Sequence, residues 1–454
     1  MRPCSLHFMG IGGVGMCALA ELMLARRFQV SGCDLQASER TAELERRGAS
    51  VVIGHDPAHL EGVDALIVTS AVEGNHPEIS AARERGLPVV RRATLLAEVM
   101  RDRLGVAVAG THGKTTTSAL AGFLLTRGGL DPTVVIGGRS AFLAGHSRDG
   151  NGRLMVCEAD EYDRSFLELH PAWLVITSVE PEHLDTYGSV DALEEAFSAL
   201  ASRVPFYGAV IACADNPGAV RVSAELERRV LTYGFAEGAW MRAVDVEAEA
   251  AGSRFGVIAG STRLGDVELP LPGRHNVANA LAALAVGLEQ GLAFARMAAD
   301  LRDFPGVARR FELVGERDGV TVVDDYAHHP TELRAVVAAA RERFPGRRLV
   351  VVFQPHLYSR TGRFAEEFGE VLAGAERVVL PPIFPAREAP LEGVSSALIA
   401  EAVIRNGGER AELPASLDAA VALLHRMLQP GDVLLTAGAG DVNRVARAWV
   451  GGAA

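Results

Sequence analysis

Short apolar runs alternate along most of the chain with segments whose apolar positions recur at the helical period. Such runs are typical of strands buried in a parallel sheet, and the alternation predicts β-strand–α-helix units and an α/β fold. The strands expected in the first half of the chain are Leu6–Met9, Gln29–Cys33, Val51–Ile53, Ala65–Thr69, Val106–Ala109, Leu154–Glu158, Trp173–Val179 and Val210–Ala212.

The pattern changes between Met241 and Leu271, where apolar and polar residues alternate around glycine and aspartate turns. This indicates antiparallel strands, inserted before a helix over Asn276–Gln290. Proline and glycine within Asp303–Val307 predict a linker. Beyond the linker a third α/β block is expected, with strands at Val320–Asp324, Leu349–Gln354 and Val433–Thr436.

The composition fits a globular protein of about three domains, at roughly 100–200 residues for each domain. The chain has 454 residues, 48% of them hydrophobic and 22% charged, which excludes an intrinsically disordered chain. Its net charge of −12 makes nucleic acid an unsuitable partner for the surface as a whole. We expect a cytoplasmic protein without membrane insertion, because there is no signal peptide, no long apolar run and no CxxC pair among five cysteines.

The most specific motif lies between a predicted strand and a helix predicted over Thr117–Leu125, and it reads Gly110-Thr111-His112-Gly113-Lys114-Thr115-Thr116. Glycines let backbone N–H groups face a phosphate, Lys114 can reach the outer phosphates, and the Thr115 hydroxyl can ligate Mg²⁺. Lys114 is the single lysine among 45 basic residues, so its position after Gly113 favours a specific role. The match to a Walker A motif is incomplete because Val108 replaces the first glycine, and a helix entry that binds nothing is the alternative.

A second glycine loop, Gly10-Ile11-Gly12-Gly13-Val14-Gly15, follows the first predicted strand, with Asp34 further along the chain. This is the fingerprint of a loop that holds a nucleotide diphosphate, with an acid for a ribose hydroxyl. It does not distinguish NAD from another nucleotide, so a nicotinamide cofactor and an empty loop both stay open.

Carboxylates and a histidine follow two further strands, at Glu158 and His183. The carboxyl ends of parallel strands share one edge of a sheet, so both residues are expected near the phosphate loop and its metal. An exposed acidic turn and a hydrogen-bonded histidine are the alternative. Polar stretches at 273–279, 324–330 and 354–361 are further candidates, for which helix capping and ordinary loop polarity are the alternatives.

Together these motifs resemble the Mur ligase family in order and over essentially the whole chain. The motifs that carry the resemblance are His7–Met16, Gly110–Thr116, Glu158–Glu161, Pro181–Tyr187, His275–Asn279, Arg309–Phe311, Asp325–Pro330, Gln354–Thr361 and Gly438–Asp441.

The resemblance is closest to the branch of the family that adds L-alanine to UDP-N-acetylmuramate in peptidoglycan precursor synthesis. It implies a Rossmann-like domain for the UDP substrate (residues 1–104), a central P-loop domain for ATP (105–306) and a Rossmann-like domain completing the amino-acid and nucleotide site (307–454). It also implies an acyl-phosphate intermediate, ATP with two Mg²⁺ ions, and a monomer or weak homodimer.

Residue by residue, the resemblance assigns four sets of site residues. The ATP contacts implied are Gly110, Thr111, His112, Gly113, Lys114, Thr115, Thr116, Asn276, Asn279, Arg310 and Asp325. The metal ligands implied are Thr115, Glu158 and His183. The substrate contacts implied are Gly12, Gly13, Val14, Gly15, Asp34, Ser70, Tyr326, His328, His356 and Arg360. Catalytic roles fall on Lys114, His183, His356 and Arg360.

The chain departs from the family pattern at Leu357, Ser178 and Tyr162, where Arg, Asn and Ser are more usual. Sister ligases often place a carbamylated lysine near the second metal, and no lysine besides Lys114 exists here for that role. Competing functions are an NAD(P)-dependent dehydrogenase, an ATP-hydrolysing regulator, a ligase for recycled tripeptide and a folylpolyglutamate synthase.

Overall fold

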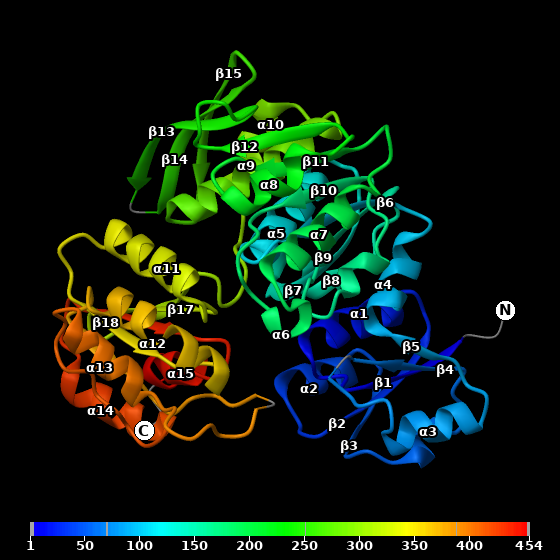
Figure 1. Cartoon of the computed structure of the whole chain (residues 1–454), viewed down its shortest axis with the longest axis horizontal. Helices are drawn as coiled ribbons and strands as arrows, with labels where there is room; N and C mark the ends of the chain where they lie inside the picture. The colour runs from blue at the N-terminus through cyan, green and yellow to red at the C-terminus, as the bar shows by residue number, and fades with distance from the viewer. Residues whose placement is uncertain (1–3, 70, 250, 387, 452–454) are drawn as a thin grey trace. The chain divides into compact units, whose positions relative to one another are not determined.

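The structure is a computed structural model that describes residues 4–69, 71–249, 251–386 and 388–451. These residues form two compact units. The first unit holds the chain up to Asp245, Phe255–Glu268 and Ala278–Pro305, and the second holds Val246–Arg254, Leu269–Val277 and the chain from Gly306. Three sheets follow one another along the chain, and each is flanked by helices (Figure 1). The predicted α/β class is confirmed, whereas the domain boundaries after residues 104 and 306 stay predictions.

The first sheet is wholly parallel, in the order β3-β2-β1-β4-β5. Strand order reverses between β1 and β4, and α/β sheets bind ligands at the carboxyl ends of strands beside such a point. The strands are β1 (Ser5–Met9), β2 (Gln29–Asp34), β3 (Ser50–Ile53), β4 (Ala65–Val68) and β5 (Val89–Arg91). The helices are α1 (Val14–Ala25), α2 (Glu39–Arg46), η1 (Pro57–Leu60), α3 (Pro77–Glu84) and α4 (Arg92–Met100).

The second sheet has ten strands in the order β15-β14-β13-β12-β11-β10-β6-β9-β7-β8. Its inner strands are buried almost throughout, as expected for a parallel sheet covered on both faces. The strands are β6 (Leu104–Ala109), β7 (Thr133–Ser140), β8 (Gly145–Arg148), β9 (Leu154–Ala159), β10 (Trp173–Ile176), β11 (Ala209–Cys213), β12 (Val230–Gly234), β13 (Met241–Glu249), β14 (Gly252–Ala259) and β15 (Thr262–Leu269). The helices are α5 (Lys114–Arg127), η2 (Ala141–Leu143), η3 (Ser165–Glu168), α6 (Leu184–Tyr187), α7 (Val190–Ala201), α8 (Pro217–Ala224), α9 (Arg274–Glu289) and α10 (Phe294–Leu301).

The antiparallel strands predicted after Met241 are present. The N–H of Gly260 donates to the carbonyl of Trp240 over 2.7 Å, so the end of β14 lies beside the start of β13. Three strands of the second sheet were not predicted: β12, β7, and β8, which pairs antiparallel to β7. Helix α5 also begins at Lys114, earlier than predicted, because Gly113 caps it in the left-handed conformation (φ 79°).

The third sheet has the order β16-β17-β20-β18-β19 and is parallel except for β16. Its strands are β16 (Glu312–Arg317), β17 (Val320–Asp325), β18 (Leu349–Phe353), β19 (Arg377–Val379) and β20 (Val433–Ala437). Its helices are α11 (Pro330–Arg343), α12 (Tyr358–Leu372), α13 (Ala397–Arg405), α14 (Leu417–Met427) and α15 (Asn443–Gly451). Among the helices that the structure describes, none has the length and apolar character needed to cross a membrane.

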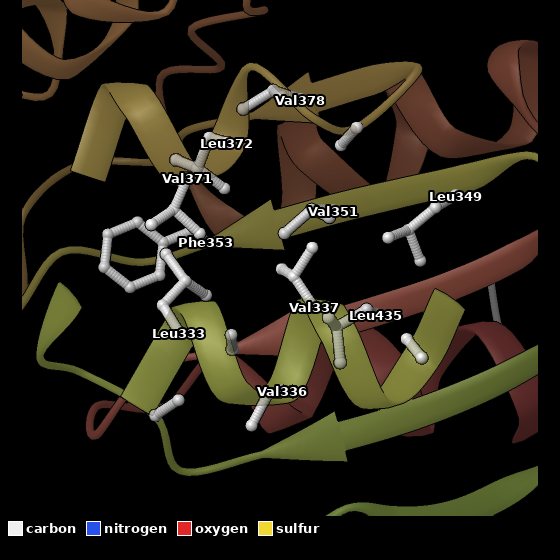
Figure 2. Packing of buried hydrophobic residues seen from close by; sticks show 14 of the residues in the cluster. Leu333, Val336, Val337, Leu349, Val351, Phe353, Val371, Leu372, Val378 and Leu435 are labelled. Carbon is white, nitrogen blue, oxygen red and sulfur yellow. The ribbon is translucent and has the colours of Figure 1, made fainter. Parts of the chain in front are cut away.

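The third sheet separates two hydrophobic cores. Successive side chains of a strand point to opposite faces, so Val351 and Phe353 of β18 enter one core while Val350 and Val352 enter the other. Figure 2 shows the first core, in which Phe353 lies among side chains from helices α11 and α12. The rings of Phe353 and Phe368 are 4.8 Å apart between centroids.

Replacing Phe353 by alanine removes a fully buried ring from this core. We expect Phe353→Ala to lower the free energy of unfolding of this domain by about 3–5 kcal/mol, the usual cost of deleting a buried aromatic side chain. Urea unfolding followed by the fluorescence of Trp449 measures it, in a background where Trp173 and Trp240 are phenylalanine. A loss below 1 kcal/mol would contradict the assigned packing.

Candidate active site

The predicted phosphate loop joins β6 to α5 at the carboxyl edge of the second sheet. Gly110 has a φ of 135°, and a Cβ on it would lie 2.1 Å from Oγ1 of Thr177, so only glycine fits there. The N–H groups of Thr111 and His112 donate to the carbonyl and hydroxyl oxygens of Ser178, over 2.9 and 3.0 Å. The loop is therefore fastened to the segment after β10. Ser178, one of the departures from the family pattern, supplies both acceptors.

Lys114, the single lysine, is held beside carboxylates at the start of α5. Its Nζ donates to Oε2 of Glu161 over 2.7 Å and to the carbonyl of Gly110 over 2.6 Å. Burial alone would lower the pKa of Lys114, but the negative charges of Glu161 and Asp160 raise it above its ordinary value. The side chain therefore stays a cation, as contact with a phosphate requires.

Thr115 and Glu158, the predicted ligands of one metal, lie together. Oγ1 of Thr115 donates to Oε2 of Glu158 over 3.1 Å, and Glu158 also accepts the N–H of Gly137. A hydroxyl and a carboxylate at one strand edge are oxygen donors of the kind that Mg²⁺ prefers, so this pair fits the ion.

His183 approaches a buried carboxylate that sequence reasoning did not assign. Its Nε2 lies 4.0 Å from Oε1 of Glu161 and 3.8 Å from Oε2 of Glu182. Among the described residues none gives Oε1 of Glu161 a hydrogen bond, although Glu161 is only 1% exposed. Glu161 belongs to the same motif as Glu158 and follows the same strand. Its place near the phosphate loop could therefore have been predicted by the argument used for Glu158.

Asn279 supports the loop, and Asn276 supports its own helix. Oγ1 of Thr117 donates to Oδ1 of Asn279 over 3.1 Å, and a Cβ on Gly113 would lie 2.6 Å from that same oxygen. Asn276 donates through Nδ2 to the carbonyl of Pro272 over 2.8 Å. Asn276 is the third residue of α9, which begins at Arg274, earlier than predicted, so this contact is not the N-cap that the sequence left open. The predicted adenine contact of Asn276 stays a prediction.

The glycine loop of the first sheet is held by its own acid. The N–H of Gly12 donates to Oδ2 of Asp34 over 2.9 Å, and Arg40 donates to the carbonyl of Gly12. Gly13 caps α1, which begins at Val14, and a Cβ on Gly15 would contact the Arg92 side chain at 3.1 Å. Ser70, the remaining residue predicted to bind the UDP substrate, lies outside the described residues.

Four predicted residues of the third domain lie side by side. Ring centroids are 5.5 Å apart for Tyr326 and His328, and 5.9 Å apart for His328 and His356. Nδ1 of His356 lies 3.2 Å from a guanidinium nitrogen of Arg360. The structure thus joins the ends of β17 and β18 into one cluster of polar rings and a cation.

Arg309, which was not assigned a role, fixes the loops around that cluster. Its guanidinium donates to Oδ2 of Asp324 over 3.2 Å and to the carbonyls of Gly440 and Gly438 over 2.9 and 2.5 Å. The neighbouring Arg310 guanidinium lies 5.0 Å from the ring centroid of Tyr326. In the sequence, only the adjacency of Arg309 to Arg310, which was assigned a nucleotide contact, pointed to a role for Arg309.

Asp325 is buried and accepts two backbone hydrogen bonds. Its carboxylate takes the N–H groups of Phe311 and Ala327, each over 2.7 Å. Burial raises the pKa of Asp325 to about 6, against the opposing effects of Arg310 and these two N–H groups. Asp325 therefore shapes the turn after β17, and its predicted nucleotide contact is untested.

A sheet whose parallel strands carry a glycine loop, a half-buried ammonium and a hydroxyl–carboxylate pair at one edge defines a phosphate-binding enzyme of the P-loop class. Comparison with known families matches residues 5–104 to "Mur ligase family, catalytic domain", 108–287 to "Mur ligase middle domain" and 309–440 to "Mur ligase, glutamate ligase domain". The chain belongs to the Mur ligase family, as its motifs predicted.

Relatives of nearly equal length carry one name. UDP-N-acetylmuramate–L-alanine ligase of Salinibacter ruber is 44% identical, over 99% of this chain and 95% of the relative. The protein of that name from Acidithiobacillus ferrooxidans is 46% identical, over 98% and 97%. The crystal structure of UDP-N-acetylmuramate-alanine ligase MurC from Thermotoga maritima is also similar, with a TM-score of 0.86 and 29% identity, over 98% of each chain.

Asp324 provides a test of the electrostatics of the third domain. Burial raises its pKa from 3.8 to about 6, although Arg309 and Thr436 act in the opposite direction. A raised carboxyl pKa stabilises the fold fully below pH 4, and this contribution is lost as the pH rises through about 6. The asparagine side chain introduced by Asp324→Asn does not titrate, so the variant should not lose this contribution. We therefore expect the free energy of unfolding of the variant, relative to that of the wild type, to rise by at most about 3 kcal/mol as the pH increases from 4 to 7.

Unfolding free energies of both proteins at pH 4, 5, 6 and 7 measure this difference. Asp318→Asn is the control, because the Asp318 side chain is 72% exposed and its replacement should give a nearly constant difference. A constant difference for Asp324→Asn as well would show that the buried carboxyl has an ordinary pKa.

Proposed function

We propose that this protein is an ATP-dependent ligase that joins L-alanine to the carboxylate of UDP-N-acetylmuramate, in the synthesis of peptidoglycan precursors. The observation that carries the proposal is the arrangement of Lys114, Thr115, Glu158 and Glu161 around one phosphate loop. The names of the full-length relatives supply the substrates.

The proposed reaction has two transfers. The muramate carboxylate attacks the γ-phosphorus of ATP, the bond to ADP breaks, and an acyl phosphate forms. The amine of L-alanine then attacks the acyl carbon, loses a proton, and expels phosphate as the amide forms. A carboxylate is a poor acyl donor because oxide would have to leave, and phosphorylation replaces oxide by a stable leaving group.

The residues of the first unit serve the nucleotide and the UDP substrate. Lys114 neutralises charge on the outer phosphates, while the loop N–H groups and the start of α5 bind the remaining oxygens. Two Mg²⁺ ions, when bound, neutralise the phosphate oxygens on which charge develops. Thr115 with Glu158 would hold one, and His183 with Glu161 the other. Gly12–Gly15, Asp34 and Ser70 are the proposed contacts of the UDP group.

The residues of the second unit serve the reacting carboxylate and the amino acid. Arg360 would pair with the muramate carboxylate, and His356 orients its guanidinium through their 3.2 Å contact. Tyr326 and His328 would surround the incoming amine. Arg310 and Asp325 stay proposed nucleotide contacts, and the cytoplasmic location and the monomeric or weakly dimeric state stay predictions.

Phosphate release from ATP tests the function directly. We expect turnover only when ATP, Mg²⁺, UDP-N-acetylmuramate and L-alanine are all supplied, with one amide formed for each phosphate released, as followed by mass spectrometry of the UDP product. Phosphate release without the sugar substrate would instead indicate an ATP-hydrolysing regulator. Hydride transfer to a nicotinamide without ATP would indicate a dehydrogenase.

The Lys114→Arg substitution tests whether the phosphate loop needs the shape of lysine or only its positive charge. Arginine keeps the charge, but its planar fork cannot occupy the position that a compact ammonium takes beside Gly110 and Glu161. We expect kcat for ligation to fall by about 100- to 1,000-fold, with an unchanged circular dichroism spectrum. Arg221→Lys, at an exposed pair with Glu194, is the control and should leave kcat unchanged. Near-normal turnover of Lys114→Arg would refute the assigned role.

A further inference from the structure

A cluster of potential metal ligands lies in the first sheet, away from the phosphate loop of the second. It contains His7 of β1, Cys33 of β2, His59 of η1 and Glu78 of α3. Each can offer one ligand atom, and the four atoms lie within 4.8 Å of one another. The proposed ligase reaction gives none of these side chains a role.

Burial makes the cluster unusual. Glu78 and Cys33 are 0% exposed and His7 is 1% exposed. A buried carboxylate is costly unless other groups compensate its charge. Glu78 accepts the N–H of Asp56 over 3.0 Å, and its oxygens lie 3.0 Å from Nδ1 of His55, 3.1 Å from Nδ1 of His59 and 3.5 Å from Sγ of Cys33. The four side chains therefore form a compact set around one carboxylate, and the partly exposed His55 is a further neighbour of that carboxylate.

His7 supplies an independent sign of a missing partner. Its Nδ1 contacts Oγ of Ser31 at 2.9 Å, whereas none of the described residues gives its buried Nε2 a hydrogen bond. A histidine that ligates a metal through one ring nitrogen usually has its other nitrogen fixed by an outer hydrogen-bond partner, as Ser31 fixes Nδ1 of His7.

We propose that His7, Cys33, His59 and Glu78 bind one Zn²⁺ ion, with Nε2 as the ligand atom of His7. Two nitrogens, one sulfur and one carboxylate oxygen are a donor set that selects zinc over magnesium. Binding releases the Cys33 proton to solvent, and the thiolate and carboxylate then balance the two charges of the ion. The occupied site is electrically neutral, which suits a buried position.

The geometry needs only a small contraction. Tetrahedral zinc places neighbouring ligand atoms about 3.3–3.8 Å apart. His59 can move to meet this requirement because it lies on a short 3-10 helix and its side chain is 17% exposed. The ion would fasten η1 and α3 to β1 and β2. It would also fix Cys33, whose carbonyl accepts the N–H groups of Gly10 and Ile11 over 2.8 and 3.0 Å. The site is therefore structural and supports the glycine loop.

Cobalt titration of the full-length protein tests the site. Protein stripped of metal by a chelator receives Co²⁺ in the presence of excess Mg²⁺, which occupies the phosphate-loop ligands. We expect one equivalent to bind with a sulfur-to-cobalt charge-transfer band and intense visible absorption, and Zn²⁺ to displace it. Zn²⁺ should also raise the Tm of the stripped protein.

Variants assign the ligands. Cys33→Ser should abolish the charge-transfer band, while Cys213→Ser, at another buried thiol, should keep it. His59→Gln changes a partly exposed side chain and should fold, with Co²⁺ affinity lowered at least about 10- to 100-fold. No charge-transfer band in the wild type, a band that persists in Cys33→Ser, or unchanged affinity in His59→Gln would each overturn the proposal.

Discussion

Charge balance at the phosphate loop is the constraint on which the site depends. One ammonium, Lys114, faces Glu158, Asp160 and Glu161, and their charges keep it protonated despite its burial. A bound triphosphate adds more negative charge at the same place, which a single lysine cannot neutralise. Cations must therefore accompany the nucleotide, to compensate the negative charge of the triphosphate and of the carboxylates beside Thr115. The carboxylates that hold the lysine in position are also the groups available to hold those cations.

The sequence was informative wherever a function requires one residue type at one spacing. Gly110 and Gly113 need positive φ values, and Lys114 and Thr115 must follow them at the start of a helix, so the loop could be recognised from its letters. The buried strands of all three sheets were visible as apolar runs for a similar local reason. The roles predicted for His356 and Arg360 came from the family resemblance, and their contact could not be predicted from helical spacing because His356 precedes α12.

What escaped prediction depends on partners that are distant along the chain. Helix α1 is buried around most of its circumference because β7 and β8 of the second sheet cover the side that its own sheet leaves open. β7 combines an apolar start with two glycines, Gly137 and Gly138, and has no strand-like alternation to reveal it. Glu161 and Arg309 stand beside residues with assigned roles, and only folding shows that they contact Lys114 and the Gly438 loop.

The three sheets use one construction for different tasks. In each, a strand ends in a glycine turn before a helix, and a distant side chain holds that turn: Asp34 at Gly12, Ser178 at His112, and Arg309 at Gly438. Only the second turn adds a half-buried ammonium, Lys114, which donates to the Glu161 carboxylate beside the Thr115–Glu158 pair. Phosphoryl transfer needs charge compensation at the atoms that react, whereas binding a substrate needs only shape and hydrogen bonds. The chemistry therefore belongs to the turn that carries Lys114, and the other two turns are suited to holding and orienting what it acts on.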